Sequence, residues 1–454
     1  MKNFGEKTKR WFKSLFVQTD GNEPKMLTFI KKEGTQTVIS SILCALLGIL
    51  LGYIVLLCIN AENAGKAMGA ILKNFGNFSS NPRLEKYYFG STLVKSVPLI
   101  MCGLSVMFAY KAGLFNIGVG GQYCIGICFS LYAALVWQLP WYACIIVAAL
   151  IGALWGALSG LFKALFNVNE VIACIMTNWI GLYLTNIMLS NPKAMNPTLS
   201  ETHSLFKNAP NALIPSGGLS DAFNKNKYVT IAIIFTIIIA IIVLIVMNKT
   251  TFGYELKATG NNKFAAKYAG MKDKRNIILT MAISGALASL GAAFFYLTGI
   301  ENFKTASSVP AMGFNGIAVA FLGGLNPIGI VVAGLFIEHI TLGGGYVDTT
   351  YYNPQVADLM IAIIIYLCAF VLFFKQFMKK YLNKLTEKIA GKTGAQAEVA
   401  ADSTVTETAS DASDGEINDN SETPEEEFKK EVETEVEEMP PIVDEKSGKE
   451  VDEK

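Results

Sequence analysis

Two glycine-rich stretches place amide side chains inside apolar segments, where these groups can contact a polar solute. Irregular backbone within a membrane is tolerated only where protein buries it or where it lines a water-filled cavity. A half-helix end offers unpaired NH and CO groups to a solute, and missing side chains leave room for it. We therefore expect a translocation path at these breaks, although close helix packing is the simpler explanation for each single glycine. The residues concerned are Asn116, Gly118, Gly120 and Gln122 in "GLFNIGVGGQYCIGI", and Asn315 and Gly316 in "GFNGIAVAFLGGLNPIG".

Other polar side chains in apolar segments allow two interpretations. Thr177 and Asn178 in "IACIMTNWIGLYL" can face a polar pathway, and Asn178 is our candidate there, or they can bond a neighbouring helix. Glu338 and His339 lie near the external end of the ninth segment, and Asp358, near the external end of the tenth, can pair with one of them. Lys95, early in its segment, is expected to extend its amine outward.

Metal, cofactor and nucleotide sites are not expected. Cys124 and Cys128 are four residues apart, but the segment contains no further metal ligands. The sequence "AGKTG" resembles the end of a phosphate-binding loop, yet Thr386 occupies the position of the required leading glycine. The two histidines of the chain, His203 and His339, lack clustered partners for catalysis, so an enzyme is the least favoured class.

The composition is that of a membrane protein. Of the 454 residues, 52% are hydrophobic and 17% are charged, and the mean hydropathy is +0.39. A spanning helix needs about 20 mostly apolar residues, and the sequence predicts an all-α membrane protein with about ten segments, some short or broken. The predicted segments are 38–59, 91–109, 115–137, 141–161, 171–189, 228–247, 276–297, 313–322, 327–340 and 356–374.

Charge divides the chain into three parts. Residues 1–37 are basic and can form a short interfacial helix, residues 38–380 form the transmembrane domain, and residues 381–454 form an acidic tail that we expect to be disordered. The last 60 residues hold 21 of the 37 acidic but only 5 of the 38 basic side chains. Placing both termini in the cytoplasm puts 23 basic residues on the inside and 9 on the outside. We therefore expect a multi-pass plasma-membrane protein with both termini in the cytoplasm.

The two glycine-rich breaks belong to the third and eighth predicted segments. Five crossings separate these segments, and an odd number reverses their orientation. The halves of the bundle are therefore expected to form an inverted repeat, an arrangement in which paired broken segments point to a transport site.

The loop from Phe252 to Arg275 contains a second informative pattern. Its "NNKFAAKYAG" predicts a short helix that is capped by Asn261 or Asn262. Ala265, Ala266 and Gly270 leave space for a close-fitting partner, and the flanking lysines suit an acidic surface. An ordinary solvated loop helix is an equally good interpretation of the loop alone.

Four motifs together resemble the membrane permease of bacterial ABC importers of the ribose/branched-chain amino acid superfamily, and most closely its nucleoside-type members. They are "GLFNIGVGGQ", "NEVIACIMTNWIGLYL", "KATGNNKFAAKYAG" and "GFNGIAVAFLGGLNPIGI". The resemblance implies a second permease, cytoplasmic ATP-binding subunits and an external solute-binding lipoprotein as partners. It also implies an ATPase-coupling role for the element that holds Gly260, Ala265, Ala266 and Gly270, although Phe264 stands where the family often has an acidic residue.

The expected function is therefore that of an importer's permease subunit. It would move a nucleoside or related small polar solute, contact membrane lipid and no nucleic acid, and leave ATP hydrolysis to separate subunits. The alternative is a self-contained secondary transporter, which would need an ionisable group at the membrane midplane. A scaffold or receptor that acts through the acidic tail is a further alternative, but it would leave the polar breaks without a role.

Overall fold

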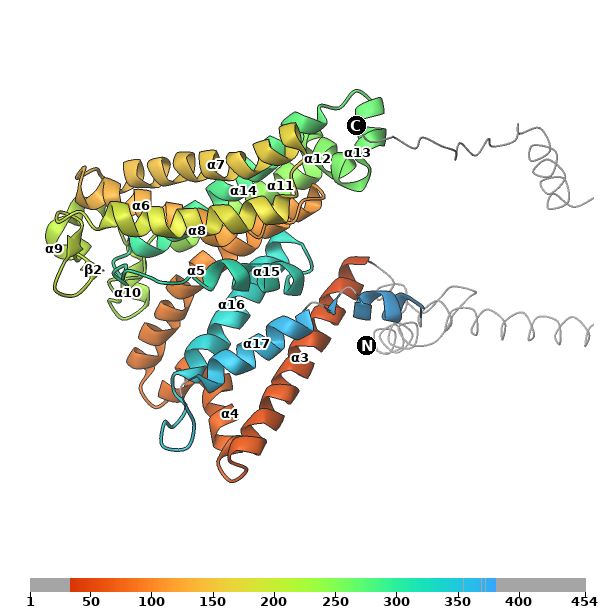
Figure 1. Cartoon of the computed structure of the whole chain (residues 1–454). Helices are drawn as coiled ribbons and strands as arrows, with labels where there is room; N and C mark the ends of the chain where they lie inside the picture. Colours follow the sequence, from red (N-terminus) through yellow and green to blue (C-terminus); the bar gives the residue numbers. More distant parts are fainter. Residues whose placement is uncertain (1–32, 354, 369, 372, 381–454) are drawn as a thin grey trace, which may run out of the picture. The chain divides into compact units, whose positions relative to one another are not determined.

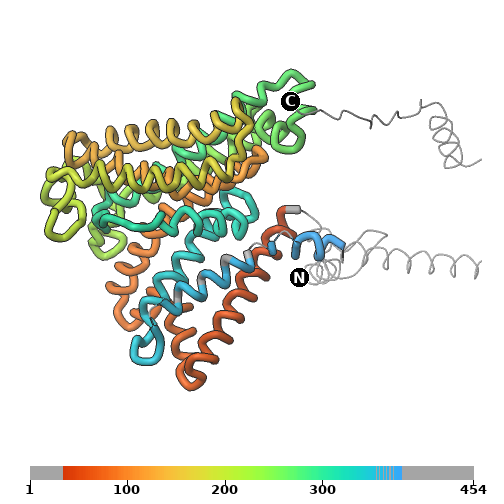
Figure 2. Tube along the Cα trace, viewed as in Figure 1, coloured from red at the N-terminus to blue at the C-terminus, as the bar shows by residue number. Residues whose placement is uncertain are grey.

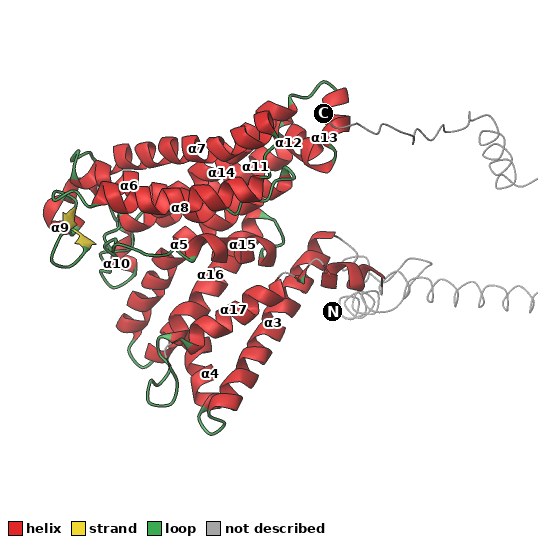
Figure 3. Ribbon diagram, in the orientation of Figure 1, coloured by secondary structure: helices red, strands yellow, loops and turns green. Residues whose placement is uncertain are grey.

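The computed structural model describes residues 33–353, 355–368, 370–371 and 373–380, and this part of the chain is almost entirely helical (Figures 1 and 3). The expected interfacial helix near the N-terminus and the expected disorder of the acidic tail concern residues outside the described ones. The long α-helices are α3 (Glu33–Ile59), α5 (Pro82–Lys111), α6 (Val119–Leu135), α7 (Trp141–Phe166), α8 (Glu170–Leu189), α11 (Ala232–Lys249), α14 (Asp273–Tyr296), α16 (Pro327–Gly344) and α17 (Val356–Cys368). The shorter ones are α4 (Ala64–Lys73), α9 (Leu205–Asn208), α10 (Leu219–Ala222), α12 (Thr251–Asn261), α13 (Lys263–Tyr268) and α15 (Met312–Leu322).

Each of the ten apolar segments expected from the sequence contains a helix within its described residues, so the all-α prediction is confirmed. Within the described residues, seven helices are long and apolar enough to cross a membrane, namely α3, α5, α7, α8, α11, α14 and α16. The two glycine-rich segments form the shorter apolar helices α6, with 17 residues, and α15, with 11 residues. The chain is non-helical from Ala112 to Gly118 before α6, whereas Asn315 and Gly316 lie inside α15 and the second interruption is Gly323 to Asn326.

Helix α5 lies at the centre of the packing. Every residue from Ser96 to Ala109 is buried, so this mostly apolar part of the helix is enclosed on all sides. Helices α11, α14, α15 and α16 all pack against it. A helix that is hydrophobic on every side is stable only when other helices surround it, which is the position that α5 occupies.

Helices α7 and α14 lie side by side because glycines bring their backbones together (Figure 1). Gly152 and Gly156 are spaced by four residues on one face of α7, opposite Gly285 of α14. A methyl group placed on Gly285 would lie 2.9 Å from the α-carbon of Gly156. Small residues at such spacing allow tight van der Waals contact between helices in a membrane.

The outward face of α7 is different. Leu150 and Leu154 are exposed by 60% and 67%, in a helix whose opposite face is buried. Exposed apolar surface of this extent is suited to contact with lipid chains or with another membrane helix.

The long connection between α8 and α11 is folded. It contains the antiparallel strands β1 (Met195–Asn196) and β2 (Glu201–Thr202), helices α9 and α10, and the 3₁₀ helix η2 (Pro210–Ala212) (Figure 3). The other 3₁₀ helix of the described residues, η1 (Asn74–Phe78), follows α4. Leu205, Ala209 and Ile214 are buried in the main apolar core. The connection is therefore a small folded segment that contributes residues to the core.

Candidate functional site

The first glycine-rich stretch is a non-helical break between α5 and α6. Helix α5 ends at Lys111 and α6 begins at Val119. Gly113 has φ = +74°, a left-handed conformation that glycine adopts without steric cost. The chain therefore turns sharply after α5 and enters α6 through buried residues.

The side chain of Asn116 holds this break in place. It is fully buried, and its Nδ2 atom donates to Gln122 Oε1 at 2.9 Å and to Ser284 Oγ at 2.7 Å. Its Oδ1 atom accepts from the backbone nitrogen of Gly118 at 2.9 Å. The Ser284 hydroxyl in turn donates to the Ser105 carbonyl oxygen at 2.8 Å. One amide thus joins the break to α6, α14 and, through Ser284, to α5.

Asn178 of α8 caps the beginning of α6. Its Oδ1 atom accepts from the backbone nitrogen of Gly121 at 2.7 Å, and its Nδ2 atom donates to the Ile117 carbonyl oxygen at 3.0 Å. The first NH groups of a helix lack intrahelical partners, and a side-chain oxygen at the cap position usually accepts from one of them. Gly118 occupies the cap position of α6 and has no side chain, so a neighbouring helix supplies the acceptor.

The two glycine-rich stretches meet at their backbones. A methyl group placed on Gly313, in α15, would lie 2.5 Å from both the nitrogen and the α-carbon of Gly120, in α6. One on Gly316 would lie 2.6 Å from Cys102 Cβ of α5. Real Cβ atoms do not approach so closely, so glycine is required at both positions unless the helices separate. Segments that are almost 200 residues apart in the sequence therefore form one contact.

The residues expected to line a path thus fall into two groups. Five of them are buried around the start of α6, and Gly316 is buried against α5. The five are Asn116, Gly118, Gly120, Gln122 and, from α8, Asn178. Asn315 is only half-buried, and no hydrogen bond of its side chain is found within the described residues. Sequence analysis missed Ser105, Ser284 and Ser289, whose hydroxyls bond to this network or to the Gln122 backbone. The small-residue run "SGALASLG" was the available signal for two of these serines.

Charged side chains near one end of the bundle form a separate group. Lys95 pairs with Glu301 at 3.3 Å, which agrees with an amine that extends outward. His339 Nε2 lies 2.9 Å from the Leu72 carbonyl oxygen, and its Nδ1 lies 3.3 Å from Asn74 Nδ2, so its ring is engaged by the segment around η1. Asp358 is exposed, and no ion pair to it is found in the described part of the chain. Within that part, no three His, Cys, Asp or Glu side chains come together to hold a metal ion.

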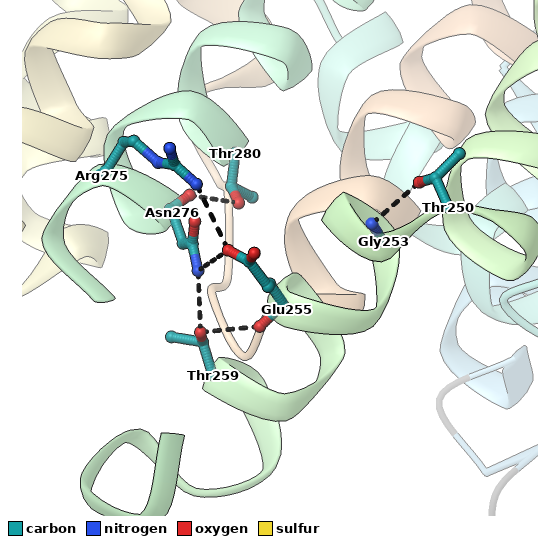
Figure 4. A network of polar contacts seen from close by, with 7 residues as sticks. All are labelled: Thr250, Gly253, Glu255, Thr259, Arg275, Asn276 and Thr280. Carbon is teal, nitrogen blue, oxygen red and sulfur yellow. Dashed lines mark hydrogen bonds and ion pairs between the residues drawn. The ribbon is translucent and has the colours of Figure 1, made fainter. Parts of the chain in front are cut away.

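Helix α12 is fixed to α14 by a polar network (Figure 4). Arg275 pairs with Glu255 at 3.3 Å, and Asn276 Nδ2 donates to Thr259 Oγ1 at 3.2 Å. Asn276 is 1% exposed, so its bond to Thr259 is shielded from water and stronger than an equivalent bond on the surface. These contacts hold the segment between α11 and α14 against the end of the bundle.

The short helix expected in this segment is α13, and Asn262 is its cap. Asn262 Oδ1 accepts from the backbone nitrogens of Phe264 and Ala265, both at 3.0 Å. Gly270 has φ = +81°, while its own NH bonds to the Lys267 carbonyl oxygen and the Met271 NH bonds to that of Ala266. This pair of bonds is the Schellman motif, which places a left-handed glycine just after a helix. The local reason for Gly270 is therefore the end of α13.

One face of α13 is apolar and exposed. Phe264 and Tyr268 are spaced by four residues and are exposed by 84% and 97%, whereas Ala266 is buried within the chain. Ala265 is exposed. Beside this helix is an open groove of about 650 Å³, lined in part by Tyr254, Ala269 and Gly270. Two aromatic side chains almost entirely in solvent next to a groove are typical of an interaction surface.

The chain matches a known family over most of this architecture. Residues 88–369 match the family described as "Branched-chain amino acid transport system / permease component". This range covers the two glycine-rich breaks, Asn178 and the α12–α13 segment. No solved structure matches the chain.

Three similar proteins are permeases with named solutes. The guanosine ABC transporter permease protein NupP of Bacillus subtilis is 33% identical over 62% of this chain and 80% of its own length. The nucleoside ABC transporter permease protein NupB of Lactococcus lactis subsp. cremoris is 31% identical over 74% and 91%, respectively. The glucose ABC transporter permease protein TsgB13 of Haloferax volcanii is 28% identical over 59% and 72%.

Proposed function

Because this chain belongs to the permease component family of branched-chain amino acid transport systems and is the multi-pass permease subunit of an ABC importer, we propose that its solute is a nucleoside. The observation that carries the proposal is the similarity to two permeases whose names specify guanosine or nucleosides. The glucose permease is less similar and shares a smaller part of this chain. ATP-binding and solute-binding partners follow from the family, and ATP hydrolysis belongs to the separate subunits.

We assign α13 as the element that docks on the ATP-binding subunit. Its support is the exposed pair Phe264 and Tyr268 beside the groove that Gly270 lines. Aromatic side chains that enter a partner's pocket often dominate the binding free energy of an interface. Of the residues that the family resemblance connects with coupling, Ala265 faces out with this pair, whereas Ala266 packs inward and Gly260 lies against the rest of the bundle.

This assignment also orients the chain in the plasma membrane. If α13 meets a cytoplasmic ATPase, the segment from Lys249 to Arg275 is cytoplasmic, and both termini are cytoplasmic when all ten segments cross. The folded segment between α8 and α11 then lies outside, where a solute-binding lipoprotein can dock. The exposed apolar face of α7 is available to lipid or to a second permease subunit.

We place the solute path beside the contact of α6 with α15. The support is that the two short helices meet there and that Asn315, two residues after Gly313 in α15, has a half-buried amide. The buried residues Asn116, Gln122 and Asn178 hold the end of α6 in the conformation described here. They would contact the solute only if that end opens, because their hydrogen bonds are now made within the protein.

ATP-driven uptake requires that nucleotide binding favour one access state over the other. A ligand shifts such an equilibrium only by its differential interaction with the two states. Closure of the ATPase pair would displace α13, and the attached helices would then change access at the α6–α15 junction.

Transport by the reconstituted complex tests this proposal. The permease, its ATP-binding subunits and its solute-binding protein are placed in proteoliposomes, and uptake of labelled guanosine is followed with ATP, without ATP and with excess glucose. We expect saturable uptake that needs ATP and resists glucose. ATP-driven uptake of glucose in place of guanosine would overturn the solute assignment.

A further inference from the structure

Two glycines bring the α12–α13 segment into direct backbone contact with the break before α6. A methyl group on Gly113 would lie 2.7 Å from the α-carbon of Gly260. One on Gly260 would lie 2.6 Å from both the Gly113 nitrogen and the Ala112 carbonyl carbon. No side chain separates the two segments at this point, so a movement of one changes the space that is available to the other.

The α12 side of this contact leads directly to the proposed docking helix. Gly260 lies in the last turn of α12, and Asn262 caps α13 two residues later. Figure 2 traces this passage in green, at one end of the helices that surround it. Thr259, beside Gly260, bonds to Asn276 of α14, so the end of α12 is held at a defined position.

The other side of the contact leads to the proposed solute path. Gly113 is three residues before Asn116, whose side chain fixes the entry to α6. Gly120, one residue into α6, touches Gly313 of α15. Close-packed protein transmits displacement because it has low compressibility. The break from Ala112 to Gly118 therefore forms a direct packed connection between the α12–α13 segment and the two short helices.

We propose that the Gly113–Gly260 backbone contact is the positioning contact through which displacement of α13 reaches the beginning of α6. This inference rests on the proposed docking role of α13. A contact with only a packing role would affect assembly or abundance, whereas a positioning contact affects the coupling between hydrolysis and uptake.

The test variant is Gly260→Ala in the full importer complex. The φ of Gly260 is not positive, so alanine is compatible with its helical backbone conformation, and the atoms nearest to the added methyl group are backbone atoms of Ala112 and Gly113. Because the methyl group meets backbone, we expect a lowered thermal midpoint, but normal association with the ATP-binding subunits in the protein that reaches the membrane. Uptake per assembled complex should fall about 10-fold, within the range of coupling energies found for such residues, while ATPase activity without solute-binding protein stays at the wild-type level.

The matched control is Gly69→Ala in α4. It makes the same chemical change in a helix, at a glycine whose added methyl group would meet nothing within 4 Å. We expect it to leave uptake and ATPase activity unchanged. Wild-type uptake by Gly260→Ala, or loss of its ATPase association, would overturn the positioning role.

A measurement on the unmodified protein tests the inference without any substitution, so misfolding of a variant does not affect it. Backbone hydrogen exchange is compared for the permease with and without its ATP-binding subunits. The proposal expects altered protection at residues 112–118 as well as at 251–271, and a change confined to 251–271 would contradict it. Unaltered protection at 251–271 would instead refute docking at α13, which separates failure of the proposed function from failure of this inference.

Discussion

The side chain of Asn178 in α8 accepts a hydrogen bond from the backbone nitrogen of Gly121 in α6, at 2.7 Å. A helix that begins without a capping side chain is thus capped by its neighbour. Because the same amide also donates to the Ile117 carbonyl oxygen, it satisfies two backbone groups at the non-helical entry to α6.

Replacing Asn178 with alanine is therefore expected to destabilise the permease. Two buried backbone groups would lose their partners, at a cost of about 1–3 kcal/mol each. Asn169→Ala is the control, because Asn169 caps α8 at an exposed position and its loss should cost only about 1 kcal/mol. The measurement is thermal unfolding of the detergent-solubilised protein. Equal shifts in Tm for both variants would contradict the conclusion that Asn178 of α8 caps α6.

The exposed aromatic pair of α13 can be tested without disturbing the fold. Phe264→Ala and Tyr268→Ala remove side chains that make little contact within the chain, so unfolding should change little. If these rings enter an ATPase pocket, each change should weaken association by about 2 kcal/mol, which is roughly 30-fold. Binding of the ATP-binding subunit to the purified permease measures this effect.

Tyr351→Ala is the matched control for the aromatic pair. Tyr351 is 48% exposed in the loop between α16 and α17, far from α13 in the sequence. ATPase binding should be unchanged. Unaltered binding by both α13 variants would move the docking site elsewhere.

Substitutions at Gly270 separate the effect of its left-handed backbone conformation from the effect of side-chain bulk in the groove. Its left-handed φ of +81° disfavours alanine by about 1–2 kcal/mol, whereas asparagine adopts this conformation more readily. We therefore expect Gly270→Asn to retain more ATPase association and uptake than Gly270→Ala. Gly270→Glu adds bulk and charge to the groove lining and should associate least, while Lys272→Ala should have a small effect. An order in which alanine outperforms asparagine would show that side-chain bulk in the groove matters more than helix termination.

Because α6 and α15 touch at their backbones, one added methyl group at Gly313 is expected to lower both stability and uptake. Gly313→Ala would force its Cβ against the backbone of Gly120, and such overpacking costs about 1–3 kcal/mol. Uptake and the thermal midpoint should both fall. Gly65→Ala in α4, where nothing lies within 4 Å of the added group, is the control and should match the wild type. A Gly313→Ala protein with normal stability and uptake would mean that α6 and α15 can separate freely.

The sequence by itself determined the helical class, the ten apolar segments and the site of the loop helix α13. These features depend on local properties, namely runs of apolar residues, the capping ability of Asn262 and the interruption of helices by glycine. The motif pattern also identified the family. Each of these signals lies within a few tens of residues, so no long-range contact was needed to find them.

Tertiary structure decided what the polar residues contact. The sequence predicted that Asn116 lines a solute path, and it left Asn178 open between such a path and a bond to a neighbouring helix. In the structure, each bonds to backbone or side-chain groups of neighbouring segments. Ala266 faces inward although the sequence grouped it with Ala265, because the turn of α13 places them on different sides. The contacts of Gly113 with Gly260 and of Gly120 with Gly313 join segments more than 140 residues apart. Such contacts depend on how whole helices cross, and no local pattern of residues encodes that geometry.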